Sequence, residues 1–314
     1  MHVHRQLDDL PKLRRPVLTI GSFDGVHLGH QALLSRIVSE ARAIDGESVL
    51  VTFDPHPRHV LAKANAAPLK LLTTTAEKID RLRALGLDHV VIVSFDRAFA
   101  AQTAEEYLRN FLFGKFSPHT VVIGYDHRFG AGRTGDIGLL RQVAQEGGIV
   151  VDEIAAQDIE RIAVSSTRIR TAVSDGDVET AARLLGSPYP LTGRIVHGQA
   201  IGRTIGFPTA NLDIANAHKL LPADGVYAVR AHLRESDESH IAMLYVGERP
   251  SLAGKLPRSV EVNILDFDRD VYGQLMQVDL VARVRMDETF DSLDALRQQI
   301  ERDRERTRAI FAEA

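Results

Sequence analysis

Two histidines and three glycines stand close together near the N-terminus. They lie in the segment Gly21–His30, GSFDGVHLGH, between the apolar run PVLTI and a stretch with helical periodicity. Where a strand runs into a helix, free N–H groups and the positive helix end favour an anion such as a phosphate. The glycines allow close backbone approach, and His27 and His30 lie about one helical turn apart. We expect both imidazoles to stabilise charge on the α-phosphate and the departing pyrophosphate, as positioned donors rather than bases.

Two alternative interpretations of the histidine pair remain open. The pair could merely cap the helix that follows, or it could ligate a metal ion. The chain contains no cysteine, and no His-x-x-x-His spacing accompanies the motif, so a metal centre is disfavoured. The combined spacing of glycines and histidines favours a phosphate site over a cap.

A second glycine-rich segment, Gly198–Leu212, reads GQAIGRTIGFPTANL. The chain has no GxxxxGK[ST] motif, so a kinase site here would hold ATP without a P-loop. The glycines again permit close backbone approach, and Arg203 supplies positive charge. Thr209 and Asn211 offer the oxygen donors that Mg²⁺ prefers. The segment therefore predicts a phosphoryl-transfer site with magnesium.

A third segment, Gly130–Gly135, matches the dinucleotide fingerprint as GAGRTG, and Asp152 follows about as far on as an NAD site would place its acidic residue. An NAD-dependent dehydrogenase is therefore an alternative. The fingerprint requires a strand that runs directly into the glycine turn. Here the expected strand ends near Gly124, so the spacing argues against a dehydrogenase.

The elements that must position these residues differ between the two halves of the chain. From Arg15 to about Val151, short β-branched runs alternate with helical patterns, which predicts a parallel sheet covered by helices. One expected helix carries an apolar stripe at Leu33, Leu34, Ile37, Val38 and Ala41.

Beyond Gly186 the proline-rich connector SPYPLTG leads into a series of strands with short turns. Such a series suggests a small closed antiparallel barrel, with an amphipathic helix at the C-terminal end from about Leu293. In one expected strand the alternating residues that should face the core are Val278, Leu280, Ala282, Val284 and Met286.

Composition narrows the classes of partner. At 314 residues the chain is long enough for two domains. A formal net charge of -4 argues against nucleic-acid binding, and the absence of cysteine excludes disulfides and thiolate chemistry. No apolar run approaches the length of a membrane span, and the N-terminal residues lack the apolar stretch of a signal peptide. We therefore expect a cytoplasmic protein with small-molecule substrates and no membrane partner; the sequence gives no sign of an oligomeric state.

The two glycine-rich segments Gly21–His30 and Gly198–Leu212 resemble motifs of the bacterial bifunctional riboflavin kinase/FAD synthetase family. The resemblance extends over nearly the whole chain. Four further segments carry it: TFDPHP at Thr52–Pro57, GYDHRFGAGRTGD at Gly124–Asp136, SSTRIR at Ser165–Arg170 and VEVNILDF around Glu261. The resemblance implies a Rossmann-like α/β nucleotidyltransferase domain in residues 1–186. It also implies an antiparallel β-barrel riboflavin kinase domain with a C-terminal helix in residues 187–314. The kinase would make FMN from riboflavin and ATP, and the first domain would make FAD from FMN and a second ATP, with Mg²⁺ at both steps.

The resemblance also implies roles for residues of the first half. His27, His30 and Arg168 would be catalytic, and a guanidinium suits phosphate oxygens because it binds them bidentately. We expect Ser165, Ser166 and Thr167 to begin a helix and cap it. The residues expected to bind nucleotide or flavin are Gly21, Phe23, Asp24, Gly25, Asp126, Arg128, Phe129, Ser165, Ser166 and Thr167.

In the second half, the resemblance makes Glu261 the general base toward the ribityl hydroxyl. Thr209 and Asn211 would contact magnesium and the nucleotide phosphates, and the remaining nucleotide-binding positions are Gly202, Arg203 and Gly206. The chain departs from the family pattern at His127, Leu252 and Asn263, which bears on flavin affinity more than on catalysis.

Two rival functions remain. One is a flavin-binding or regulatory protein with a silent kinase half, against which Thr209, Asn211 and Glu261 together speak. The other is an adenylyltransferase with a different acceptor, such as a pantetheine or nicotinamide ester. A half that produces FMN beside it favours FMN as the acceptor.

Overall fold

The structure is a computed structural model that describes residues 1–63, 66–124, 127–154, 156–197, 206–236, 238–247 and 258–313, with the backbone alone for 156–165. The chain forms two compact units. Unit 1 comprises Met1–Leu69 and Thr75–Ser166, and unit 2 comprises Lys70–Thr74 and Thr167–Ala314. Each unit has its own hydrophobic core.

Unit 1 contains a six-stranded sheet in the order β1-β4-β3-β2-β5-β6, in which every pair is parallel. The strands are β1 (His2–His4), β2 (Val17–Ile20), β3 (Ser48–Asp54), β4 (His89–Ser94), β5 (Thr120–Gly124) and β6 (Val150–Ile154). The predicted parallel sheet is confirmed. Strand order reverses between β2 and β5, and in such sheets ligands bind beyond the carboxyl ends of the strands at this switch point.

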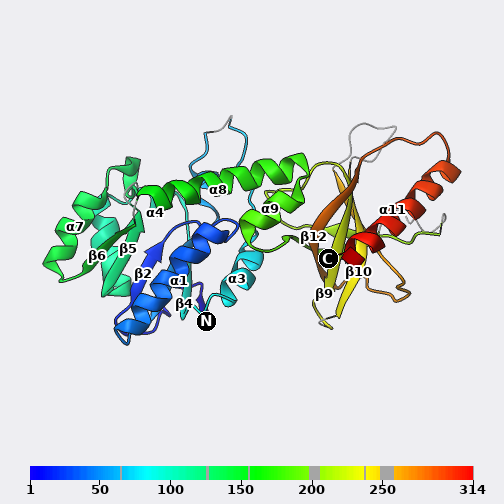
Figure 1. The fold of residues 1–314 in the computed structure, drawn as a ribbon. Helices are drawn as coiled ribbons and strands as arrows, with labels where there is room; N and C mark the ends of the chain where they lie inside the picture. Colours follow the sequence, from blue (N-terminus) through cyan, green and yellow to red (C-terminus); the bar gives the residue numbers. More distant parts are fainter. Residues whose placement is uncertain are drawn as a thin grey trace. The chain divides into compact units, whose positions relative to one another are not determined.

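Helices cover both faces of this sheet (Figure 1). On one face α1 (Leu28–Ala43) and α3 (Thr75–Arg83) bury apolar residues against the strands. The predicted stripe of α1 is confirmed: Leu34, Ile37, Val38 and Ala41 are buried and Leu33 is partly buried. The π-helix η1 (Tyr107–Phe113) and α7 (Ile137–Glu146) cover the other face. The shorter helical segments are α2 (Pro57–Val60), α4 (Arg97–Ala100), α5 (Ala104–Glu106), α6 (Gly114–Phe116) and η2 (Ala131–Arg133).

Unit 2 contains a closed barrel in the order β10-β11-β8-β7-β12-β9, with antiparallel pairing throughout. The strands are β7 (Tyr189–Val196), β8 (Ala210–Asp213), β9 (Gly225–Leu233), β10 (Glu238–Gly247), β11 (Ser259–Ile264) and β12 (Leu275–Met286). The helix α11 (Leu293–Glu313) follows, so the predicted barrel and C-terminal helix are confirmed.

The predicted alternation along β12 is only partly right. Val278 and Leu280 are buried in the barrel, but Met286 is 66% exposed. The register of β12 against β9 shifts between Leu280 and Ala282 and again between Arg283 and Arg285. Each shift inserts an extra residue, and an extra residue moves the following side chains to the other face. The bulges therefore end the simple period of two.

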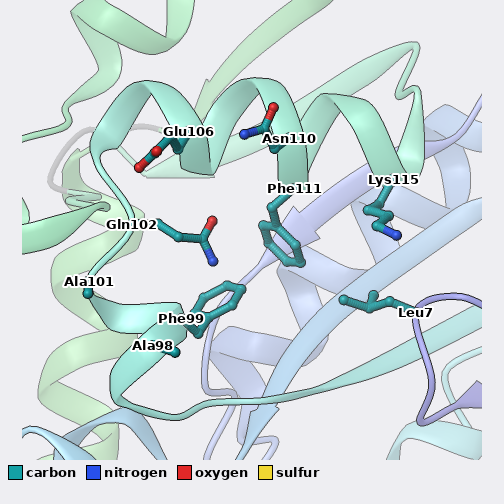
Figure 2. A pocket seen from close by; sticks show the side chains of 9 residues that line it. All are labelled: Leu7, Ala98, Phe99, Ala101, Gln102, Glu106, Asn110, Phe111 and Lys115. Atoms are coloured by element: carbon teal, nitrogen blue, oxygen red, sulfur yellow. The ribbon is translucent and has the colours of Figure 1, made fainter.

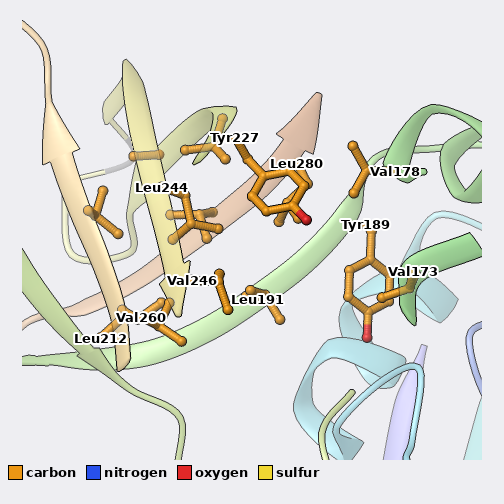
Figure 3. Close-up of a cluster of buried hydrophobic side chains, with 14 of the residues drawn as sticks. Val173, Val178, Tyr189, Leu191, Leu212, Tyr227, Leu244, Val246, Val260 and Leu280 are labelled. Carbon is orange, nitrogen blue, oxygen red and sulfur yellow. The ribbon is translucent and has the colours of Figure 1, made fainter. Parts of the chain in front are cut away.

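The core of unit 2 joins the barrel interior to residues that come before it in the chain (Figure 3). Val173 of α8 (Ala156–Asp175) and Val178 of α9 (Val178–Leu185) are fully buried with the barrel residues Tyr227 and Leu244. Helical residues before 187 thus complete the packing of the barrel.

The segment Lys70–Thr74 belongs to this core as well. The Leu71 amide donates to the carbonyl of His218 (2.7 Å), and the Leu220 amide donates to the carbonyl of Leu71 (2.9 Å). Buried Lys219 donates from Nζ to the carbonyl of Leu72 (2.6 Å), whose side chain is fully buried. A short piece of the first sequence half is therefore built into unit 2. Among the described residues, none of the helices is sufficiently long and apolar to cross a membrane.

We predict that Leu72→Ala destabilises unit 2 by about 2–5 kcal/mol, because it removes buried methyl groups and leaves a cavity. Hydrogen exchange should accelerate in β7 and β9 while β2 and β3 of unit 1 keep their protection. Leu61→Ala is the control, because Leu61 is 60% exposed. Faster exchange in β2 and β3 alone would contradict the assignment of Leu72 to the barrel core.

Candidate active sites

The motif Gly21–His30 forms the turn between β2 and α1, at the switch point of the unit 1 sheet. The Gly21 amide donates to the carbonyl of Val51 (3.0 Å), which fixes the start of the turn to β3. Phe23, Gly25 and Val26 then adopt positive φ values of 47°, 86° and 43°. Left-handed backbone is unfavourable for a β-branched residue such as valine, so the surroundings must hold this conformation.

The two predicted catalytic histidines lie side by side at the end of this turn. Their ring centroids are 3.7 Å apart and the planes differ by 15°. Both side chains are buried. His27 is the N-cap of α1, and its Nδ1 accepts a hydrogen bond from the His30 amide (3.3 Å). If the imidazole is neutral, Nδ1 as acceptor leaves the proton on Nε2.

The other nitrogen of His27 contacts a second predicted residue. Nε2 lies 2.8 Å from Oγ of Ser166 in α8. In the tautomer that caps α1, Nε2–H donates to this hydroxyl. The structure thus brings Ser166 to the neighbouring pair His27 and His30, although 139 positions separate it from His27 in the sequence.

A Cβ at Gly21 would lie 3.0 Å from the ring of Phe23, which is closer than an ordinary contact, so glycine suits this position. That ring is buried and lies 4.8 Å, centroid to centroid, from the ring of His30. The carboxylate-bearing Asp24 is buried as well. The predicted residues Gly21, Phe23, Asp24 and Gly25 therefore form the wall and backbone of one turn.

Two side chains outside the motif hold this turn at one backbone carbonyl. The carbonyl of Ser22 accepts hydrogen bonds from Oγ1 of Thr52 (3.1 Å) and from Nζ of Lys78 (2.6 Å). Lys78 is not among the residues that the sequence motifs predict for the site. The available signal is its place in α3, beside buried Ile79 and one turn before buried Leu82.

The expectation for SSTRIR is wrong in one respect. Helix α8 begins at Ala156, so Ser165, Ser166 and Thr167 lie within the helix and do not cap it. The serine and threonine types alone suggested a helix start, but the helical segment continues through them. Thr167 and Arg168 are exposed on this helix, and the side chain of Ser165 lies outside the described residues.

The segment that resembles a dinucleotide fingerprint has a packing role. A Cβ at Gly135 would lie 2.4 Å from the ring of Phe129, and one at Gly130 would lie 2.6 Å from the backbone of Ala104. Phe129 is buried and stacks on Tyr107 with a centroid distance of 5.1 Å. Because β5 ends at Gly124, no strand runs directly into these glycines, which argues against the dehydrogenase alternative.

The remaining predicted residues of this half are placed in part. Arg128 is exposed and pairs with Asp136, with Nη1 3.1 Å from Oδ2. Asp126 lies outside the described residues. Phe129 takes its place in the core described above.

In unit 2 the predicted phosphoryl-transfer residues meet on two neighbouring strands. Glu261 of β11 is directly opposite Asn211 of β8. Thr209, just before β8, donates from Oγ1 to Oε2 of Glu261 (3.1 Å), and Oγ of Ser259 lies 3.4 Å from Oε1. Gly202 and Arg203 lie outside the described residues, as does Leu252. Gly206 is exposed with a φ of 87°, which favours glycine.

These polar residues face away from the barrel core. Ala210 and Leu212 of β8 and Val260 and Val262 of β11 belong to that core. Side chains of a strand alternate between faces, so Asn211 and Glu261 point outward. Asn263, two residues beyond Glu261, donates from Nδ2 to the carbonyl of Pro208 (2.7 Å) and so fixes the backbone next to Thr209.

A small second cluster of apolar side chains lies on this outer side. Val226, Met243 and Leu265 are buried there, with partly buried Tyr245 and Ile300 of α11 packed against them. Tyr245 is directly opposite Glu261. Burial and, to a smaller extent, the neighbouring Asp287 together raise the pKa of Tyr245 to about 12. The candidate site is therefore half-buried and contains a neutral phenol.

Among the described residues, no group of three or more His, Asp or Glu side chains is arranged to hold a metal ion. A cavity of about 520 Å³ in unit 1 is lined by Phe99, Gln102, Phe111 and Lys115 among others (Figure 2). None of the predicted site residues lines it.

Comparison with known proteins identifies both halves. A family model described as FAD synthetase matches residues 10–168, and one described as riboflavin kinase matches residues 185–311. The chain belongs to the bifunctional riboflavin kinase/FMN adenylyltransferase family. The family member from Escherichia coli K12 is 39% identical over 94% of this chain and 92% of its own length. The member from Haemophilus influenzae is 36% identical over 94% of each.

A solved structure agrees over the whole length. A crystal structure from Streptococcus pneumoniae, titled as a macrolide-efflux protein, has a TM-score of 0.83 and 32% identity. The match covers 98% of each chain. The fold of both units is therefore shared with an experimentally solved protein.

We predict that the ultraviolet titration of Tyr245 has its midpoint near pH 12, as the difference between the wild type and Tyr245→Phe. Folding raises this pKa above its ordinary value of 10.0. The contribution of the neutral phenol to the free energy of unfolding is therefore complete below pH 10 and is lost as the pH rises through 12. Asp287→Asn should lower the midpoint, because it removes a negative charge. A difference spectrum with a midpoint at the ordinary value would contradict the burial of this phenol.

Proposed function

We propose that this chain phosphorylates riboflavin to FMN in the barrel and adenylylates FMN to FAD in the α/β unit, with two ATP molecules per FAD. The observation that carries the proposal is the presence of both family matches on one chain, each over a unit whose matched motif residues converge. We assign residues 1–186 to the adenylyltransferase and 187–314 to the kinase, because the kinase match begins at residue 185.

In the adenylyl transfer, an FMN phosphate oxygen forms a bond to the α-phosphorus of ATP, and the bond to the β-phosphate oxygen breaks to release pyrophosphate. We assign His27 and His30 to stabilise the negative charge that grows on the phosphoryl oxygens. The positive end of α1 would favour the same anion. The hydrogen bond between His27 and Ser166 orients this imidazole, and a phosphate oxygen would replace the Ser166 hydroxyl as the partner of Nε2–H.

Arg168 would bind the phosphates of ATP through its guanidinium, beside Ser165, Ser166 and Thr167 on the same helix. Gly21, Phe23, Asp24 and Gly25 would shape the nucleotide pocket. Asp126, Arg128 and Phe129 would lie close to FMN or adenine; for Phe129 the buried ring suggests that it supports the pocket rather than stacks on a ligand.

In the phosphoryl transfer, the terminal ribityl oxygen forms a bond to the γ-phosphorus of ATP, and ADP leaves. We assign Glu261 as the base that accepts the hydroxyl proton. Its carboxylate is already oriented by the hydroxyls of Thr209 and Ser259. We further assign Gly202, Arg203 and Gly206 to the ATP phosphates.

Thr209 and Asn211 would hold Mg²⁺, because a threonine hydroxyl and an asparagine carbonyl are oxygen ligands of the type that this ion prefers. Their place beside the Glu261 carboxylate fits that donor set. When bound, the ion would neutralise charge on the phosphates of ATP.

The rival functions fit less well. A silent kinase half would not need Thr209 and Asn211 placed against Glu261. A different acceptor for the adenylyl group would leave the kinase half without a partner reaction. The partners that we propose are therefore ATP, riboflavin and FMN, in the cytoplasm where ATP is available.

We predict that Glu261→Gln slows FMN formation by about 10²–10⁴-fold, because the amide cannot accept the hydroxyl proton. Chromatography of the products made from riboflavin, ATP and Mg²⁺ measures this rate. When FMN is supplied directly, FAD formation should stay unchanged. Glu238→Gln is the control, because Glu238 pairs at the surface with Arg269. Unaltered FMN formation in Glu261→Gln would discard the base assignment.

We predict that His30→Ala slows FAD formation by about 10²–10³-fold while FMN accumulates, because one donor to the transition state is lost. The kinase rate of the same chain shows that unit 2 is intact, and unchanged hydrogen exchange in β2 and β3 shows that unit 1 is folded. His2→Ala, an exposed position in β1, should behave as the wild type. Equal loss of both activities would mean that the two sites are not independent.

A further inference from the structure

Lys78 is a buried amine that the mechanism above does not use. It lies in α3, 6% exposed, on the face of the helix that packs against the sheet. A lysine that is this deeply buried needs hydrogen-bond partners and opposite charge, because burial otherwise penalises its charged form. Its partners therefore indicate what it is there to do.

The hydrogen-bond partners of Lys78 lie in the turn between β2 and α1 and in the neighbouring strand β3. Nζ donates to the carbonyl of Ser22 (2.6 Å) and to Oγ1 of Thr52 (3.2 Å). Oγ1 of Thr52 donates to the same Ser22 carbonyl (3.1 Å). One carbonyl of the motif is thus held by two side chains from two different elements, α3 and β3.

The held carbonyl directly precedes the strained part of the turn. Phe23, Gly25 and Val26 follow Ser22 with left-handed backbone, and His27 comes next as the N-cap of α1. A conformation of this kind persists when its surroundings fix it. The contact to Ser22 fixes one end, and the buried side chains of Phe23 and Val26 fix the remainder.

Lys78 also partly neutralises the carboxylates of Asp24, in the turn, and Asp54, at the end of β3. The carboxylates of Asp24 and Asp54 attract its positive charge, although burial is the larger effect and lowers the pKa of Lys78. Asp24 is itself buried within the motif, and Asp54 accepts a hydrogen bond from Oγ1 of Thr75 (2.8 Å). A carboxylate close to a triphosphate repels it, so a lysine beside these two groups favours nucleotide binding.

We propose that Lys78 is a positioning residue for the adenylyl-transfer site: through the carbonyl of Ser22 it holds the turn that presents His27 and His30 to ATP. This inference rests on the proposed function of unit 1, but the conformation of the turn can be measured separately from the reaction.

The test compares Lys78→Met with the wild type in the full-length chain. Methionine keeps the length and apolar stem of lysine and removes the charge and the donors. The expected result is a rise in the KM for ATP of the FAD-forming step by about 10- to 100-fold. Loss of a hydrogen bond to a charged group typically changes an equilibrium constant by a factor of this size. FMN formation in the barrel should be unchanged. Lys78→Arg, which keeps the charge and donors, should restore part of the lost affinity.

Amide hydrogen exchange of the ligand-free protein gives the second readout. Exchange at residues 21–27 should accelerate in Lys78→Met, whether or not the reaction is as proposed. Val143→Ala is the matched control for general destabilisation, because Val143 is buried on the opposite face of the same sheet. It should leave both the KM for ATP and the exchange of the turn unaltered.

If Lys78→Met fails to fold, Thr52→Val decides the question, since it removes the other donor to the Ser22 carbonyl and valine suits a strand. It should change the KM for ATP and the exchange of residues 21–27 in the same direction. The inference is overturned if the variant that folds keeps the exchange of the turn and the KM for ATP within twofold of the wild type, or if Val143→Ala changes them equally. A wild-type chain that forms no FAD would instead refute the proposed function.

Discussion

The left-handed backbone of the turn after β2 is the constraint on which the adenylyl-transfer half depends. It directs the chain from the end of β2 into α1, so that His27 becomes the N-cap and its ring stacks on His30. Valine at position 26 resists this conformation in isolation. The turn therefore persists only because its side chains are buried against the sheet and the carbonyl before it is held from α3 and β3. The placement of the two histidines is therefore a consequence of how the sheet packs.

In the barrel, the alternation of side chains along the strands positions the polar residues of the second site. Successive residues of β8 and β11 point to opposite faces, so one face builds the core and the other carries Asn211 and Glu261. The register between the two strands then sets the distance between Glu261, the proposed base, and the proposed magnesium ligand Asn211. A shift of one residue would move Glu261 into the core, and the fully buried Val262 makes such a shift costly.

The sequence was sufficient to predict those features that depend on local period. The parallel sheet, the stripe of α1, the barrel and the C-terminal helix all follow from spacing of apolar residues. Features that depend on long-range packing were not predictable. The bulges of β12 and the burial of Lys78 involve contacts with distant segments. The residue types of SSTRIR do not show that α8 starts before them. Of the site, the pattern gave the residues; the contact between His27 and Ser166 required the fold, and the assigned roles stay predictions.

The boundary between the two activities differs from the boundary between the two cores. The kinase family match begins at residue 185, yet the barrel core includes Val173, Val178 and Leu72 from earlier in the chain. Residues 187–314 therefore do not contain the complete hydrophobic core of unit 2. The hydrogen bonds of Leu71 with His218 and Leu220 make the same point for the backbone, because they pair the barrel unit with a segment that interrupts unit 1. The chain passes between the units at residues 69–70, 74–75 and 166–167. Unit 2 therefore contains one segment from within the first half of the sequence and one that starts before residue 187. A division of this protein by sequence similarity would assign these core residues to the wrong folding unit.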